Sequence, residues 1–156
     1  LLCRLSKGIY YKPVMTKFGV LMPNVQELVK AIARRDNAQV LPTGETAANL
    51  LGLSTQVPMN YVYLTSGSAR KIMVGKKTVS FKRCVPKNFA CQSEFLAVLI
   101  QAMKAIGQDR LADEHCVVIK GLLMKHLPIE SLDADMKNAP LWVRRMVYNI
   151  IKEIGV

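Results

Sequence analysis

The sequence predicts an α+β fold whose C-terminal half is helical. Short runs that alternate apolar and polar residues, typical of strands, lie within the first 90 residues and are separated by glycine-containing turns. Longer runs with apolar residues at helical spacing occupy residues 91–156. A short helix of small residues lies among the strands. We therefore expect a small antiparallel β-meander with a central helix, an N-terminal hairpin and a helical C-terminal half.

The charge of the chain is unevenly distributed. Residues 1–40 hold 7 Lys and Arg against 2 Asp and Glu, residues 41–90 hold 7 against 1, and residues 91–156 hold 8 of each. The formal net charge of +11 therefore belongs to the first 90 residues. A basic excess confined to one half indicates a binding face for a polyanion, and a basic surface without a specific partner is the alternative.

The N-terminal segment predicts a β-hairpin with a basic tip. Residues 1–5 and 8–11 are typical of two short strands around the turn Ser6-Lys7-Gly8. On the residues alone we favour an ordinary hairpin in which Arg4, Lys7 and Lys12 form a solvated basic rim, and contact of these three cations with phosphates is the alternative. We assign residues 1–14 to this hairpin. Residues 15–156 form a second unit, with a basic α/β part at 15–90 and a helical part at 91–156.

A helix is predicted after a proline-bounded connector at residues 13–23. Asn24 is a suitable N-cap with Glu27 in the capping-box position, and the helix extends to about Arg34. Arg34 and Arg35 close the helix, where positive charge suits the negative end of the helix dipole. Phosphate contact is the second role that we consider for this pair.

The run from Leu41 to Pro58 predicts a short helix followed by a polar loop. Thr43 is a plausible N-cap, and Gly52 can end the helix. The next run, Tyr61 to Thr65, is aromatic and β-branched and favours a strand.

Two further strands are predicted at Arg70–Val74 and Thr78–Arg83, joined by a tight turn at residues 75–77. Alternation places Ser80 and Lys82 on the face opposite Val79 and Phe81. We expect these strands to carry a local basic cluster formed by Lys76, Lys77, Lys82, Arg83 and Lys87. Its role is either protection of a strand edge or contact with RNA, DNA or an acidic protein.

Three helices are predicted in the charge-balanced half, at about 94–106, 113–126 and from Asn138 onward. Ser93 can cap the first of them and Gly107 can end it. The first helix is apolar over a wide arc, so we expect it at the centre of the core.

No catalytic constellation is evident in the sequence. His115 and His126 are eleven positions apart on one predicted helix, roughly 16 Å, so they cannot share one metal ion. The basic half holds few carboxylates, at 27, 36 and 45, and no G-x-x-x-x-G-K-[ST] phosphate loop occurs. We expect no enzyme, no metal and no cofactor. A nucleic-acid-processing enzyme that depends on an acidic residue such as Glu45 is the remaining catalytic alternative.

The cysteines and the hydropathy pattern bear on the compartment. None of the four cysteines forms a C-x-x-C pair, and free thiols with apolar neighbours suit a reducing cytoplasm. The longest apolar stretch, residues 95–106, is broken by Gln101 and Lys104, so we expect no membrane span. These observations predict a cytoplasmic protein.

The central run resembles the AbiEi family of antitoxins from bacterial type IV toxin–antitoxin systems. That family carries a small-Ala-hydrophobic-x-Gly-Leu pattern, a polar loop with a proline, and a strand ending in Thr. Residues 46–53, 54–58 and 62–65 match these three pieces in order. The flanking runs 7–11, 70–72 and 81–83 support the resemblance, which covers roughly residues 4–110.

The resemblance implies an antitoxin of a phage-defence system that is also a DNA-binding transcriptional autoregulator. It implies that a winged helix-turn-helix binds inverted repeats in the operator, and that the protein counters an AbiEii-like, nucleotidyltransferase-like toxin without needing a stable complex. Residues 1–14 would be the wing, and we expect the DNA-reading helices that precede a wing to be missing from this chain. For the family-motif loop we prefer a structural role, in which polar side chains satisfy loop backbone. That loop comprises Thr43, Asn49, Ser54, Thr55 and Gln56.

A different class of function is also consistent with the residues. The chain could be a non-enzymatic protein-interaction module whose basic face docks an acidic protein or RNA. DNA binding would then be weak and indifferent to sequence.

Overall fold

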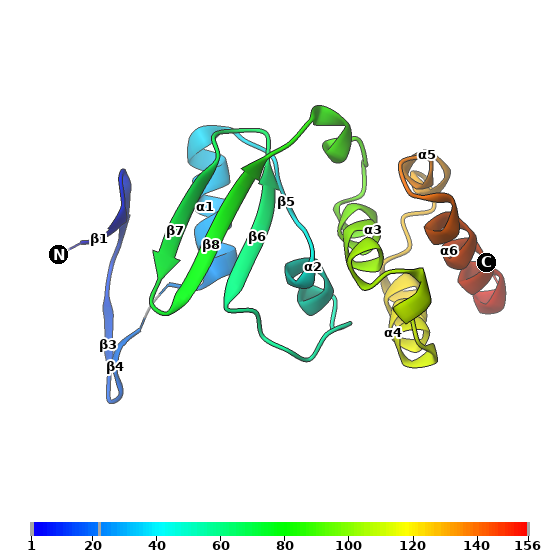
Figure 1. Ribbon diagram of the computed structural model, residues 1–156, viewed down its shortest axis with the longest axis horizontal. Coiled ribbons are helices and arrows are strands. Elements are labelled where there is room, and N and C mark those ends of the chain that lie inside the picture. The colour runs from blue at the N-terminus through cyan, green and yellow to red at the C-terminus, as the bar shows by residue number, and fades with distance from the viewer. Residues whose placement is uncertain (1, 22, 156) are drawn as a thin grey trace.

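The computed structural model describes residues 2–21 and 23–155 and confirms the α+β class. Two hairpins at the N-terminus, a sheet and a group of helices follow one another along the long axis of the molecule (Figure 1). The helical C-terminal half predicted from the sequence is present, and the sheet is mainly antiparallel.

The N-terminal segment forms two successive hairpins. Strands β1 (Cys3–Ser6) and β2 (Ile9–Tyr11) pair antiparallel, as predicted. Residues 13–23, predicted as a connector, instead contain a second antiparallel hairpin, β3 (Val14–Thr16) with β4 (Gly19–Leu21). Its turn is held by the Thr16 hydroxyl, which donates to the carbonyl of Gly19 (2.8 Å) and accepts from the amide of Phe18 (3.2 Å).

The sheet has the order β5-β6-β8-β7. Its strands are β5 (Val40–Pro42), β6 (Asn60–Thr65), β7 (Arg70–Val74) and β8 (Lys77–Arg83). The predicted meander is wrong in its order, because β8 lies between β6 and β7 and pairs with β6 in parallel. The parallel register sets Tyr61 opposite Val79 and Tyr63 opposite Phe81, and it buries all four side chains on one face. Strand β5, which has three residues, was not predicted.

Helix α1 (Val25–Asp36) covers that buried face of the sheet. Its N-cap is Asn24, as predicted, whose side chain accepts from the amides of Gln26 and Glu27. The apolar stripe of the helix packs with the sheet and with Ile9 of the first hairpin. We call this cluster the sheet core; its buried residues are Ile9, Val25, Leu28, Val29, Ile32, Tyr61, Tyr63, Ile72, Val74, Val79 and Phe81.

A second cluster, the helical core, joins α2 to the C-terminal helices. These elements are α2 (Glu45–Leu50), α3 (Glu94–Ile106), α4 (Asp113–His126), α5 (Leu132–Met136) and α6 (Leu141–Ile154). Two 3₁₀ turns, η1 (Pro86–Phe89) and η2 (Gln108–Arg110), flank α3. Ser93 caps α3 as predicted, since its hydroxyl accepts from the amide of Leu96. Leu41 of β5 belongs to the helical core, so the sheet contributes to both clusters.

Asp135 is a carboxylate buried completely within the helical half. One of its oxygens accepts from the amide of Gln92 (2.8 Å) and the other from the amide of Ser93 (2.9 Å). The side chain therefore fixes the start of α3 to α5 and satisfies two backbone donors away from water.

Among the described residues, no helix combines the length and the apolar character that crossing a bilayer requires.

Candidate nucleic-acid interface

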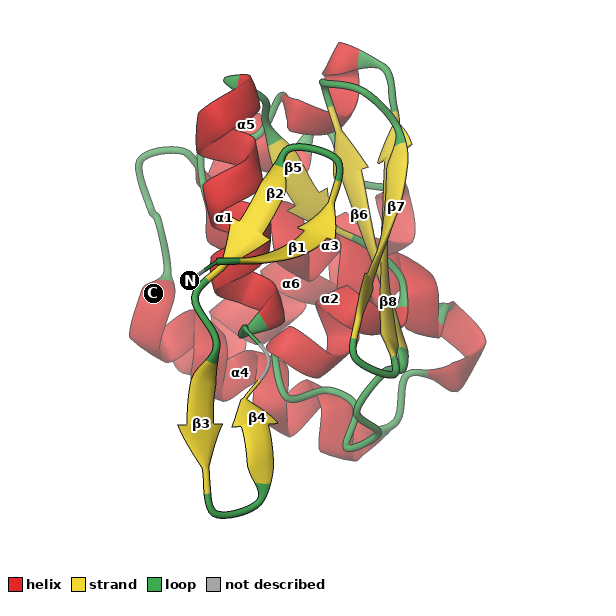
Figure 2. Ribbon diagram, turned by 90° about the vertical axis from the view of Figure 1, so that its left-hand side faces the viewer, coloured by secondary structure: helices red, strands yellow, loops and turns green. Residues whose placement is uncertain are grey.

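The outer face of the β1–β2 hairpin carries two of the predicted cations. Arg4 and Tyr10 are paired directly across the two strands, and both side chains are exposed. Lys12, two residues beyond Tyr10, is also exposed, whereas Ile9 points inward and is buried. Figure 2 shows this hairpin in front of α1 and the sheet, with its outer face open. The hairpin thus presents an aromatic ring between basic side chains.

The turn of this hairpin rests on the C-terminal end of α1. The Arg35 guanidinium donates through Nη1 to the carbonyl of Gly8 (2.6 Å) and forms a salt bridge from Nε to Asp36 (2.9 Å). The hydrogen bond from Arg35 lowers the pKa of Asp36, and the nearby charges of Arg35 and Arg70 lower it further. The structure therefore gives Arg35 a role in positioning the hairpin, while the neighbouring Arg34 is exposed at the same end of α1.

A groove of about 980 Å³ brings Lys12 together with Lys76 and Lys77. Lys12 comes from the segment after β2, and the other two come from the turn between β7 and β8. The start of α1 forms the remaining wall, where Glu27 is the acidic residue among the lining side chains. We call this feature the basic groove. It joins a cation of the predicted N-terminal hairpin to two members of the basic cluster predicted around the third strand.

An aromatic ring lies under one cation of the basic groove. The Lys77 ammonium is 5.7 Å from the centroid of the Tyr61 ring, which is within the range of a cation–π contact. Tyr11 also lines the groove. Because the Tyr61 ring is buried, this contact positions Lys77 within the groove.

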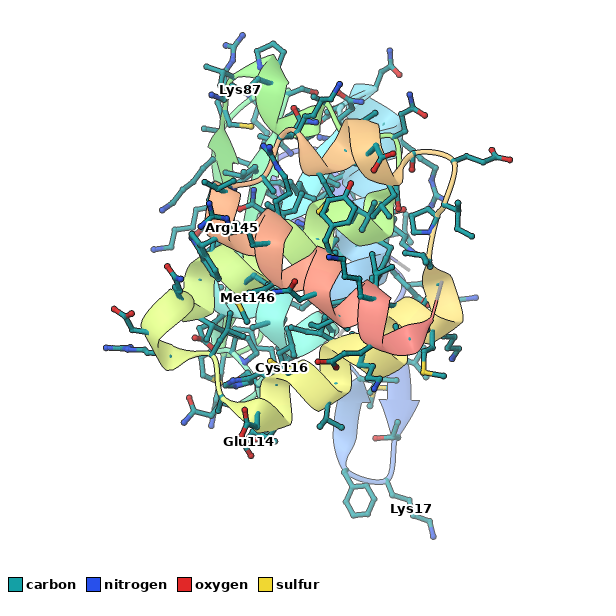
Figure 3. The ribbon with its side chains drawn as sticks, turned by 90° about the vertical axis from the view of Figure 1, so that its right-hand side faces the viewer. Lys17, Lys87, Glu114, Cys116, Arg145 and Met146 are labelled. Atoms are coloured by element: carbon teal, nitrogen blue, oxygen red, sulfur yellow. The ribbon has the colours of Figure 1, made fainter. Side chains whose placement is uncertain are left out.

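The predicted cluster around β8 is not a single cluster. Strand β8 is extended, so Lys77 and Arg83 are roughly 20 Å apart at its two ends. Lys82 lies opposite Val79 and Phe81, as alternation predicted, on the sheet face that also carries Lys71. Lys87 lies farther away, on η1, and Figure 3 shows it at the opposite end of the molecule from Lys17. Only Lys76 and Lys77 of this group reach the basic groove.

Lys87 lines a different pocket, of about 360 Å³, together with Lys104 and Lys137. This pocket belongs to the helical half, and it does not extend the basic groove.

The family-motif loop makes internal hydrogen bonds. The Asn49 amide donates to the carbonyl of Gln56 (2.9 Å), and the Ser54 hydroxyl accepts from the amide of the same residue (3.4 Å). The side chains of Thr55 and Gln56 are exposed. These bonds hold the loop in place, and Asn49 also reaches the wall of the basic groove.

Thr43 does not cap α2, contrary to the prediction. Gly44, with φ of 61°, occupies the N-cap position, because the Thr43 hydroxyl instead donates to the side-chain carbonyl of Gln101 in α3 (2.9 Å). Thr46 accepts a hydrogen bond from the amide of Val62 in β6 (2.9 Å). Both threonines therefore attach α2 and its entrance to neighbouring elements.

Both histidines have local partners. His115 Nδ1 accepts from the amide of Ala112 at the start of α4 (3.0 Å), and the ring of His126 lies 5.5 Å from that of Phe95. Within the described part of the chain, no group of three or more His, Cys, Asp or Glu side chains could hold a metal ion.

The β3–β4 hairpin is a surface feature that was not predicted from the sequence. Lys17 lies at its tip, beyond the body of the molecule (Figure 3). Next to it, Phe18 is 99% exposed. The available signal was two short runs with β-branched residues, Val14 to Thr16 and Gly19 to Leu21, on either side of a glycine-containing turn, which fit a hairpin as well as a connector.

Comparison with known proteins finds a family match. The model of a family described as "Family of unknown function (DUF6088)" matches residues 1–132. No curated protein and no solved structure matches the chain.

Proposed function

For a chain that belongs to the DUF6088 family of unknown function, we propose DNA binding through the basic groove and the outer face of the β1–β2 hairpin. One observation carries the proposal: the fold brings Lys12 to the same groove as Lys76 and Lys77, which are about 65 positions away in the sequence. Three lysines from two separate segments at one groove form a local excess of positive charge, which attracts a polyanion.

The hairpin extends this surface along α1. The turn of the hairpin, which carries Lys7, rests on the C-terminal end of α1, which carries Arg34, and Lys12 lines the basic groove. The four-residue step between Gly8 and Lys12 spans roughly 13 Å in an extended strand. This length corresponds to about four base pairs of duplex at 3.4 Å per pair. The row of cations is therefore long enough to follow several phosphates of one DNA strand.

The chemistry of this surface favours contacts with the phosphate backbone. Lysine and arginine side chains that contact phosphates release counterions and position the protein, but they do not read the base sequence. We therefore assign to the groove and the hairpin the electrostatic part of binding.

The biological role that we propose for this DNA binding rests on the resemblance of residues 46–65 to the AbiEi family. We propose that the protein is a non-enzymatic antitoxin and transcriptional autoregulator of an AbiE-like system, which acts in the cytoplasm on its own operator. Its second partner would be an AbiEii-like toxin, countered without a stable complex. The four cysteines are free thiols, which suits a reducing compartment.

A charge-matched pair of variants tests the proposal. Lys12, Lys76 and Lys77 are changed to Gln in one variant, and Lys104, Lys125 and Lys152 of the helical half are changed to Gln in the other. Both lose three charges, so any difference reflects position. We expect only the first variant to bind DNA more weakly, by more than tenfold near 100 mM salt, with a log K against log[salt] slope shallower by up to about 2.7.

The measurement is the dissociation constant for a random 30-base-pair duplex and for the upstream region, between about 50 and 300 mM salt. Equal losses in the two variants would show that no dedicated face exists. If the unmodified chain binds no DNA at about 50 mM salt, where phosphate contacts are strong, the proposal fails. Binding of RNA or an acidic protein would then be tested on the same pair of variants.

A further inference from the structure

The β3–β4 hairpin is an apolar projection that neither hydrophobic cluster covers. Phe18 is 99% exposed, and Val14, Met15 and Leu21 are each more than half exposed. Soluble proteins rarely expose several large apolar side chains together unless that surface binds something. We call residues 13–21 the arm.

The arm has a defined turn. The Thr16 hydroxyl bonds to the backbone at both Phe18 and Gly19, and Gly19 has a φ of 114°, which suits glycine. Figure 2 shows the arm projecting away from the β1–β2 hairpin and beyond the helices. The turn therefore presents Phe18 at a fixed place on the tip.

The arm begins in the proposed DNA-binding surface. Val14 and Leu21, at its base, line the basic groove together with Lys12. The arm carries Lys17 and no Asp or Glu between residues 13 and 21. A positively charged projection continuous with the groove is complementary to the same polyanion.

The dimensions of the arm fit one groove of DNA. Each strand has three residues, which give a length of roughly 10 Å. The major groove is about 12 Å wide and 8.5 Å deep and admits a two-stranded β-ribbon, whereas the minor groove is about 6 Å wide. A ribbon of this length reaches the base edges at the floor of the major groove.

From these observations we infer that the arm enters the major groove and places Phe18 against base edges, where it contacts the methyl groups of thymine. The inference rests on the proposed DNA binding and extends it from phosphate contact to base contact. Phenylalanine contacts the thymine methyl in major-groove recognition, and Lys17 at the tip can contact a flanking phosphate. The DNA ligand is thus duplex with thymine where the arm docks.

The test uses the whole chain with Phe18→Ala, and Ile129→Ala as the matched control. Ile129 is an exposed apolar residue of the helical half, so neither change removes buried packing. The DNA is a 30-base-pair pool with a randomised centre, prepared with thymine or with deoxyuridine, which lacks the methyl group. We expect the unmodified chain and Ile129→Ala to bind the thymine pool about fourfold more tightly for each methyl buried.

Phe18→Ala should bind both pools alike, with an unchanged salt slope because no charge is removed. A third pool with 5-iododeoxyuridine should cross-link on irradiation to Phe18, located by mass spectrometry of the peptide. If Phe18→Ala binds as the unmodified chain does and keeps its preference for thymine, the arm does not read bases and the inference is overturned. Cross-links found only at residues other than Phe18 would also overturn the inference.

Analytical ultracentrifugation of both variants tests the alternative that the arm binds a second copy of the chain instead of DNA. A change in oligomeric state caused by Phe18→Ala, with DNA affinity unchanged, would assign the arm to a second copy of the chain and overturn the inference. Failure of the unmodified chain to bind any pool at about 50 mM salt would overturn the proposed function as well, whereas failure of the thymine effect alone leaves phosphate binding intact.

Discussion

The sheet half and the helical half each have a hydrophobic core, but they differ in where their charges lie. Residues 1–90 hold the whole formal excess of +11, and residues 91–156 are neutral. The predicted phosphate-binding residues lie in the first half, whereas the helical core contains most of the fully buried large side chains. Under the proposed function, the sheet half would supply the binding surface, while the helical half contributes most of the large, fully buried side chains.

The two halves are nevertheless joined by specific contacts. Leu41 packs in the helical core although its strand belongs to the sheet. Thr43 bonds to Gln101 of α3, and Thr46 bonds to the backbone of β6. Helix α2 and its entrance therefore act as the junction, and we expect the two halves to unfold together.

The largest effect expected is from a cavity in the helical core. Leu99 is completely buried, and Leu99→Ala should lower the free energy of unfolding by about 2–5 kcal/mol. Urea denaturation should be followed both by fluorescence of Trp142 in α6 and by circular dichroism of the whole chain. Coincident transitions are expected because the halves are joined. Two separate midpoints would show that the sheet half and the helical half unfold as independent domains.

The next effect concerns the buried carboxylate of α5. Asp135→Asn removes one of two acceptors for the amides of Gln92 and Ser93 and should cost about 1.5–3 kcal/mol. Asp133→Asn is the control on the same helix, because Asp133 is exposed and accepts a hydrogen bond from Tyr148. Thermal denaturation of both variants measures the difference. A similar loss in the two would show that burial of Asp135 is not the cause.

The sheet core should be the more sensitive half at alkaline pH. Burial, with a smaller contribution from Tyr61, raises the pKa of Tyr63 to about 12, from an ordinary value of 10.0. The folded state thus holds this proton more tightly than the unfolded state. The corresponding stability is complete below pH 10 and is lost as pH rises from 10 to about 12, by up to roughly 1.4 kcal/mol per pH unit.

Tyr63→Phe tests this expectation, since it removes the hydroxyl but keeps the ring that stacks on Phe81. The free energy of unfolding should then vary less between pH 10 and 12 than in the unmodified chain. Tyr148→Phe is the comparison in the helical half, where a hydrogen bond to Asp133 raises the pKa of a more exposed hydroxyl. An equally steep pH dependence in Tyr63→Phe would contradict the assignment.

The smallest effect expected is at the contact between α1 and the β1–β2 hairpin. Arg35→Ala removes the hydrogen bond to Gly8 and should cost about 1 kcal/mol. Amide hydrogen exchange in the hairpin should accelerate, while exchange in the helical half stays unchanged. Arg34→Ala is the control, because that side chain is exposed and should affect DNA affinity rather than stability. If Arg34→Ala accelerated exchange in the hairpin and Arg35→Ala affected only DNA affinity, Arg34 would be the residue that positions the hairpin.

Local signals allowed much of the fold to be predicted. Asn24 and Ser93 are caps whose side chains act within three residues, and the apolar periodicity of α1, α3 and α6 is visible in the sequence alone. The order of the sheet could not be predicted, because the choice between β6–β7 and β6–β8 pairing depends on burial across distant strands rather than on any turn.

The residues of the candidate site could be predicted, but their arrangement in space could not. Charge counting identified Lys12, Lys76 and Lys77, yet it could not show that they meet at one groove. Lys77 and Arg83 were grouped because they are close in the sequence. In the structure they lie at opposite ends of the extended strand β8. Arg35 was grouped with Arg34 as a phosphate contact; its hydrogen bond to the carbonyl of Gly8 could not be anticipated, because the two residues are 27 positions apart in the sequence.

The parallel pairing of β6 with β8 also sets an order of events during folding. Strands β7 and β8 are joined by a tight turn at Gly75, where φ is 63°, and such local hairpins form within about 1–10 μs. Pairing of β6 with β8 closes a loop of 18 positions, from Asn60 to Thr78, and is the slower event. A β7–β8 hairpin that forms first can dock on β6 as a unit. Gly75→Val should therefore slow folding, whereas Val62→Ala on β6 should mainly speed unfolding.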